Sequence, residues 1–222
     1  MVRIEKNKPL PDHTKLRYQE CYAKILLERC VPKFKSGLQM RDKPDLYCSD
    51  CDTGIEVTDI MSKEKREAVK LWYTMPYVKP EQQERNIDRM KQLGVEYSRG
   101  VQTWPTITYD NGLDSTPYQE LYGAIKKKLH KLNNGNQEQF SSNELLLFTE
   151  LLLYDCVEYR IVDRLESCQN DFVKKYDTLY IVTIDWLLCY DMKSNTLEKR
   201  FFDQYTIATL ARDMVEKGEN DG

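Results

Sequence analysis

The sequence predicts an α/β fold in which a mixed β-sheet is flanked by helices. Two observations carry this prediction. Segments with helical apolar spacing alternate along the chain with short strand-like runs. One of these runs, residues 178–184, is almost entirely apolar or β-branched, as a strand buried on both faces would be. With 222 residues, the chain can bury a sizeable core, so we expect a single domain over residues 1–222 with an inserted segment.

The first part of the chain predicts one helix followed by a β-hairpin. Apolar residues recur at helical spacing between Thr14, which can cap the helix, and Arg29, and Pro32 ends the pattern. Residues 44–60 then contain two short runs of alternating character. The stretch 49–54 between them is rich in turn formers, which predicts a hairpin.

The middle of the chain is less regular. An apolar stripe predicts a second helix over residues 62–74. Residues 76–117 contain several prolines and glycines, and we expect them to form an insertion or lid-like elaboration because the stretch is long for a plain loop. Within it, residues 81–93 predict a charged helix and residues 106–109 a short strand.

The second half of the chain alternates helices with strands. A lysine-rich amphipathic helix is expected over residues 118–132, and a closing helix over residues 207–217. The other expected elements are a strand at 145–148, a helix at 156–172, strands at 178–184 and 186–190, and a turn at 191–195.

The composition limits the class of protein. With 33 Lys and Arg against 36 Asp and Glu, the formal net charge is −3, so any contact with nucleic acid requires a local basic patch. No apolar run is long enough to span a bilayer, and the first residues lack the apolar core of a secretory signal. The seven cysteines, an odd number, are typical of reduced thiols. We therefore expect a cytoplasmic protein without a membrane partner.

Cys48 and Cys51 form a C-x-x-C pair. A zinc site needs four ligands, and the sequence has neither a second such pair nor two closely spaced histidines. A thioredoxin-like pair would stand at the start of a helix, whereas this pair stands in a predicted turn. The sequence therefore favours coincidence or packing over zinc or redox chemistry.

Three oxygen-bearing side chains are expected on one face of the hairpin. With Ser49 opposite Gly54, Asp45 lies opposite Thr58, and Glu56 shares their face because side chains two apart point the same way. Hard divalent cations such as Mg²⁺ and Mn²⁺ prefer oxygen ligands, so Asp45 and Glu56 are candidate metal ligands. The alternative is a solvated hairpin whose acids keep an edge strand soluble.

The sequences Pro44-Asp45 and Glu56-x-Thr58 resemble the signature of the PD-(D/E)XK nuclease-like superfamily. That signature has an Asp on one strand, followed on the next strand by Asp or Glu, any residue and Lys. The resemblance implies a restriction-endonuclease-like core and a metal held by the two acids. In that superfamily a Glu of the first helix often joins the site, and Glu20 is the best match; its alternative role is a solvated helix charge.

Thr58 stands where the signature has its lysine, and a hydroxyl cannot supply the cation that steadies the attacking hydroxide or the phosphate. Some members of the resembled superfamily are understood to recruit this lysine from a neighbouring helix. The helix expected after the hairpin offers Lys63, Lys65 and Lys70, and Lys65 shares its apolar face. We therefore predict Lys65 as the relocated lysine; the alternative is that its stem lies along the edge of the core.

Phosphate contacts are expected from basic side chains near the hairpin and on the lysine-rich helix. Lysine binds phosphate largely independently of base sequence, although lysines on amphipathic helices are otherwise solubilising. The candidates for nucleic-acid binding are Lys126, Lys127, Lys128 and Lys131, with Lys33, Lys35, Arg41 and Lys43 as further phosphate contacts.

Other catalytic classes are disfavoured. His13 and His130 are the two histidines of the chain, which leaves little for a Cys-His or Ser-His nucleophile system. No glycine motif that cradles phosphate is present, which argues against an NTPase or a dinucleotide enzyme.

The expected function is therefore a metal-dependent phosphodiester hydrolase, a nuclease that acts on DNA or RNA with Mg²⁺ or Mn²⁺. The first alternative is a catalytically inactive nuclease-like protein that binds a protein or nucleic-acid partner, which Thr58 and the acidic net charge favour. The second is a small α/β interaction protein with no relation to the superfamily. The sequence leaves open DNA versus RNA and the oligomeric state, dimers included.

Overall fold

The structure is a computed structural model, and it describes residues 10, 14–61, 63–75, 78–93, 116–135, 138, 140–149, 155–183 and 186–220. The chain divides into two compact units. One comprises residues 1–13 and 61–112, and the other comprises residues 14–60 and 113–222.

The smaller unit contains two described helices, α3 (Lys63–Thr74) and α4 (Pro80–Gln92). Ala68 and Met75 pack against Met90 of α4, and the guanidinium of Arg89 donates to both carboxylate oxygens of Glu67, at 2.7 and 3.0 Å. The helices predicted at 62–74 and 81–93 are therefore confirmed. The strand predicted at 106–109 lies outside the described residues, as does most of the stretch after α4.

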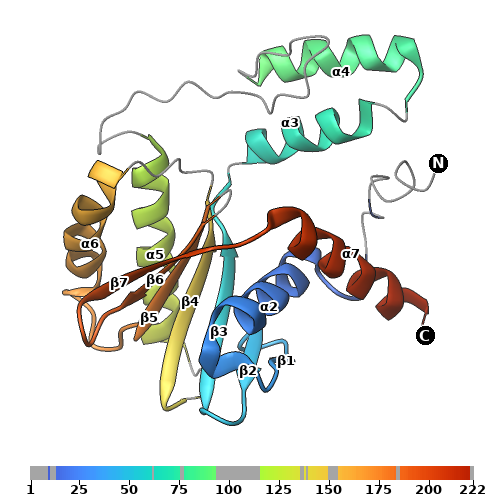
Figure 1. Cartoon of the computed structure of the whole chain (residues 1–222). Helices are drawn as coiled ribbons and strands as arrows, with labels where there is room; N and C mark the ends of the chain where they lie inside the picture. Colours follow the sequence, from blue (N-terminus) through green and yellow to red (C-terminus); the bar gives the residue numbers. More distant parts are fainter. Residues whose placement is uncertain are drawn as a thin grey trace. The chain divides into compact units, whose positions relative to one another are not determined.

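The larger unit is built on a seven-stranded sheet whose strands follow one another in chain order (Figure 1). Strands β3, β4 and β5 run parallel, and the outer pairs on both sides are antiparallel. The strands are β1 (Gln39–Met40), β2 (Leu46–Cys48), β3 (Thr53–Asp59), β4 (Ser142–Phe148), β5 (Thr178–Val182), β6 (Trp186–Asp191) and β7 (Thr196–Phe201).

Helices cover both faces of this sheet, as Figure 1 shows: α5 and α6 lie on one side, and α2 and α7 lie on the other. Parallel neighbours require a long crossover connection, which α5 supplies between β3 and β4, and α6 between β4 and β5. The helices are α2 (Tyr18–Cys30), α5 (Thr116–Asn134), α6 (Asp155–Gln169) and α7 (Gln204–Asn220), with a 3-10 turn, η1 (Pro32–Phe34), after α2. The predicted mixed sheet flanked by helices is confirmed.

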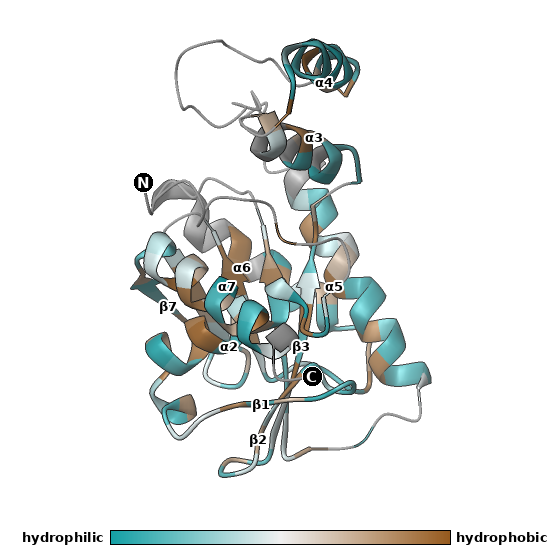
Figure 2. Cartoon of the chain, turned by 90° about the vertical axis from the view of Figure 1, so that its right-hand side faces the viewer, coloured by the Kyte–Doolittle hydropathy of each residue, from teal (hydrophilic) through white to brown (hydrophobic). Residues whose placement is uncertain are grey.

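The main core lies between the sheet and the pair α5 and α6. Figure 2 shows hydrophilic and apolar residues recurring along α5, as they do in an amphipathic helix. The same pattern is visible in α4 of the smaller unit. On the sheet, alternate residues of the central strands face this core, for example Leu145 and Leu147 of β4. From α5 the buried residues are Tyr118, Leu121, Tyr122, Ile125, Leu129 and Leu132. Since Glu56 and Thr58 of β3 pair with Leu145 and Leu147, they lie on this same face.

Two predictions about local structure are wrong. The first helix begins at Tyr18, and Arg17 occupies the capping position, whereas the Thr14 hydroxyl donates to the carbonyl of Leu16 at 2.7 Å. In the hairpin, Tyr47 and not Ser49 lies opposite Gly54. The register is therefore shifted by two residues, which preserves the face of every side chain because strands have a period of two.

Gly54 lies where β3 must pass close to an aromatic ring. A Cβ atom there would lie 2.5 and 2.7 Å from two carbons of the Phe140 ring. We expect Gly54→Ala to lower the free energy of unfolding by about 1–3 kcal/mol, because the ring has to move out of a packed position. Urea unfolding measures this loss.

Gly123 on α5 provides the matched control, since a Cβ atom there would meet no atom within 4 Å. Gly123→Ala is expected to stabilise the protein by about 0.5–1 kcal/mol through helix propensity. Equal effects of the two substitutions would contradict the close approach of Phe140 to β3.

Candidate functional site

Asp45 lies at the start of β2, beside the edge of β3. Its Oδ2 accepts a hydrogen bond from the backbone N–H of Val57 at 2.7 Å. Strand β2 begins at Leu46, which pairs with Ile55, so β3 has no β2 partner in the ladder beyond this point. The Asp45 carboxylate therefore takes the place of a strand partner, and this bond fixes its position relative to β3.

Glu56 points from β3 toward α5, where it meets a lysine. The Nζ atom of Lys128 lies 2.7 Å from the Glu56 Oε2, and the two side chains are 16% and 19% exposed. On α5, Lys128 stands three residues after Ile125 and four before Leu132, so it lies at the margin of the buried face. The fold thus places an ammonium beside the acidic pair, Asp45 and Glu56.

The pKa of Asp45 reflects its burial and the nearby carboxylate of Glu56. Burial raises the pKa of the Asp45 carboxyl above its ordinary value, and the negative charge of Glu56 raises it further. The hydrogen bond from Val57 and the ammonium of Lys128 act in the opposite direction without cancelling the rise. A bound cation would favour the ionised form of this group.

The charge of Glu20 on α2 interacts with that of Asp45. The pKa of Glu20 is raised by burial and then by the charge of Asp45, against the opposing effect of Arg17, whose guanidinium lies 3.1 Å from Glu20. The helix acid implied by the resemblance is therefore near enough to Asp45 for the two charges to interact. Among the described residues, however, no three Asp, Glu, His or Cys side chains converge as a ready-made metal site.

A small pocket of about 30 Å³ opens beside Glu56, with room for a few water molecules at most. The Tyr176 hydroxyl in its wall lies 3.5 Å from the backbone carbonyl of Lys128, to which it donates. Burial raises the Tyr176 pKa, and the charges of Glu56 and Asp45 raise it further, so this hydroxyl stays protonated. The lining residues are Lys43, Pro44, Gly54, Glu56, Leu132, Glu138, Phe140, Asn143, Glu144 and Tyr176.

The four lysines predicted on the lysine-rich helix have different environments. Lys126, Lys127 and Lys131 are exposed, and Lys128 is partly buried against Glu56. Lys128 stands three and four residues from apolar residues of α5, and this spacing is the sequence pattern that could have identified it as partly buried. The predicted relocated lysine, Lys65, belongs to α3 of the other unit, and its side chain lies outside the described residues.

The remaining predicted residue, Thr58, follows Glu56 on the same face of β3 and pairs with Leu147 of β4. The thiol of Cys51 lies within hydrogen-bonding reach of Cys48, and burial is the main cause that raises its pKa. Both thiols are free. Cys48 is the last residue of β2 and Cys51 lies in the turn that follows, so the prediction that the pair stands in the turn is confirmed only for Cys51.

Comparison of the chain with protein-family models, curated proteins and solved structures gave no match. Among the described residues, no helix has the length and apolar character needed to cross a membrane.

Proposed function

We propose that this protein is a metal-dependent phosphodiester hydrolase, a nuclease with a restriction-endonuclease-like core that acts on DNA or RNA. The observation that carries the proposal is the position of Lys128, 2.7 Å from Glu56. Thr58 leaves the motif without its lysine, and Lys128 offers an ammonium at the acidic pair from the crossover helix α5. The mixed sheet flanked by helices is compatible with such a core.

In this proposal, Asp45 and Glu56 would hold Mg²⁺ or Mn²⁺, and the charge of Glu20, which interacts with that of Asp45, would add to the negative potential there. The metal supplies an activated water and charge compensation for the pentavalent phosphate. Asp45 is kept in place by the N–H of Val57, which preorganises the pair for a cation.

Lys128 has two tasks in this arrangement. Without substrate, its ammonium forms an ion pair with Glu56 in a partly buried place. With substrate, the ammonium hydrogen-bonds a non-bridging phosphate oxygen and stabilises the charge that develops there. The flexible stem of lysine permits this small movement.

The alternative is an inactive nuclease-like protein that binds a partner. It is favoured by the lack of a three-ligand metal group among the described residues. In that case the ammonium of Lys128 replaces the metal permanently, and the ion pair with Glu56 is structural.

Calorimetric titration with Mn²⁺ tests the proposal. We expect saturable binding to the wild type that is lost in Asp45→Ala/Glu56→Ala. Affinity should fall as the pH is lowered through the raised pKa of Asp45, because protons then compete with the metal. A nuclease assay on mixed DNA and RNA substrates should show the same loss.

The matched control is Asp50→Ala/Glu166→Ala, which removes two exposed acids, one in the hairpin turn and one on α6. This variant should bind Mn²⁺ as the wild type does. Equal binding and equal hydrolysis by both double variants would reject Asp45 and Glu56 as metal ligands. Metal binding without hydrolysis would favour the inactive alternative.

A further inference from the structure

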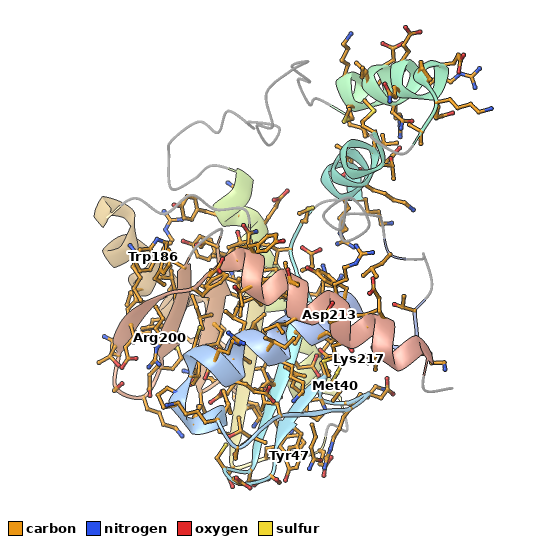
Figure 3. The ribbon with its side chains drawn as sticks, turned by 45° about the vertical axis from the view of Figure 1, so that its right-hand side comes forward. Met40, Tyr47, Trp186, Arg200, Asp213 and Lys217 are labelled. Carbon is orange, nitrogen blue, oxygen red and sulfur yellow. The ribbon has the colours of Figure 1, made fainter. Side chains whose placement is uncertain are left out.

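An arginine and two aromatic rings form a column beside the pocket, in the β1–β2 region. The guanidinium carbon of Arg41 lies 3.8 Å from the centroid of the Tyr47 ring. Tyr47 also contacts Phe140, with ring centroids 5.4 Å apart and planes tilted by 46°. Phe140 also lines the pocket that Glu56 lines. Figure 3 shows Tyr47 near the end of the sheet at which β2 turns into β3.

The column is tied to the candidate site through the backbone. The N–H of Arg41 donates to the carbonyl of Asp45 at 3.0 Å, so the residue that carries the guanidinium is fixed to the residue proposed to hold the metal. The hydroxyl of Tyr47 donates to Asp52 at 3.3 Å, which limits rotation of the ring. The column is therefore positioned before any ligand arrives.

One face of the guanidinium remains available for a ligand. The Arg41 side chain is 36% exposed, and its ion-pair partner Glu138 is 3.9 Å away and 63% exposed. A pair of this kind contributes little stability and is easily replaced. Arg200 is a contrast within the same chain, because its guanidinium donates to both the carbonyl of Cys30 and the carboxylate of Glu198.

We infer that the outer face of the Arg41 guanidinium receives an unpaired base, and that the substrate is single-stranded nucleic acid. Arginine planes and aromatic rings stack on bases in single strands. A base inside a duplex cannot bind in this way because its neighbours already cover both of its faces. Lys43, exposed and at the pocket, is placed to contact the adjacent phosphate.

This inference rests on the proposed function, since it names the substrate of the proposed hydrolase, but it is tested by binding alone. The probe is a fluorescein-labelled single-stranded DNA, compared with the same sequence as RNA and as a DNA duplex. Fluorescence anisotropy is measured in EDTA, so that neither metal binding nor cleavage contributes. The wild type is expected to bind both single strands more tightly than the duplex.

Arg41→Lys is the decisive variant because it keeps the charge and removes the stacking plane. We expect it to bind the single strand about tenfold more weakly. Its salt dependence should be unchanged, since the number of neutralised phosphates is the same. Arg212→Lys on α7, across the sheet from α5, is the control and should bind as the wild type does.

Unchanged single-strand affinity in Arg41→Lys, or duplex binding as tight as single-strand binding in the wild type, would overturn the inference. Either result leaves the hydrolase to be judged by the Asp45 and Glu56 variants. Conversely, binding that depends on Arg41 in a protein without hydrolytic activity would uphold the stacking site and reject the hydrolase.

Discussion

Replacing Lys128 with methionine is expected to reduce phosphodiester hydrolysis about 100-fold or more, because a preorganised positive charge at the developing phosphate is lost. Lys128 is the lysine found 2.7 Å from Glu56. Methionine keeps the length and apolar character of the stem, so the packing of α5 should be retained. The measurement is the single-turnover rate of cleavage at saturating Mg²⁺, with circular dichroism to confirm folding.

The control for this prediction is Lys217→Met, which removes an exposed lysine of α7 and should leave the rate close to that of the wild type. A stronger test is a rescue. Thr58 lies two residues after Glu56 on the same face of β3, where the signature has its lysine. Thr58→Lys in the Lys128→Met background is therefore expected to restore part of the lost rate.

Restoration by Thr58→Lys would show that the two positions supply the same charge, which a merely structural ion pair could not explain. A Lys128→Met protein that cleaves at the wild-type rate would reject the catalytic role. Loss of activity without any rescue, together with a lower stability, would indicate that the pair of Lys128 and Glu56 is structural.

The position of this lysine shows what the sequence could and could not predict. The hairpin acids Asp45 and Glu56 could be identified because turn residues and alternation define a local structure. Lys128 is 72 residues from Glu56, and its proximity depends on the crossover of α5 between two parallel strands. Lys65 was predicted as the relocated lysine because its helix directly follows the hairpin in the sequence. That helix, α3, belongs to the other compact unit.

The strands show the same division between local and long-range information. The buried strand β5 was predicted because its apolar run is continuous, whereas β7 was missed. The residues of β7 are exposed or partly buried, and they include the charged run Glu198-Lys199-Arg200. Its pairing with β6 comes from the sheet, since tertiary context overrides weak strand propensity. The two-residue error in the hairpin register did not affect the site because it preserved the faces.

Lys33→Met is expected to lower the free energy of unfolding by about 2–3 kcal/mol, because it leaves a buried carboxylate without its cation. Glu144 of β4 is 1% exposed, and Lys33 of η1, 40% exposed, pairs with it. The hydroxyls of Tyr180 and Ser142 donate to the same carboxylate, at 2.9 and 3.1 Å. Two neutral donors cannot compensate for the loss of a full charge in a buried place.

Urea unfolding measures this effect, and the exposed Lys35 provides the control, since Lys35→Met should change stability by less than about 0.5 kcal/mol. The charge of Glu144 itself is tested by adding Glu144→Gln to Lys33→Met. A neutral amide needs no cation: its oxygen accepts one hydroxyl bond and its NH2 group donates to the other hydroxyl oxygen, so the double variant should recover part of the loss. If Lys33→Met is as stable as Lys35→Met, Glu144 does not depend on the lysine, and η1 is held to the sheet by the packing of Phe34 on Tyr180.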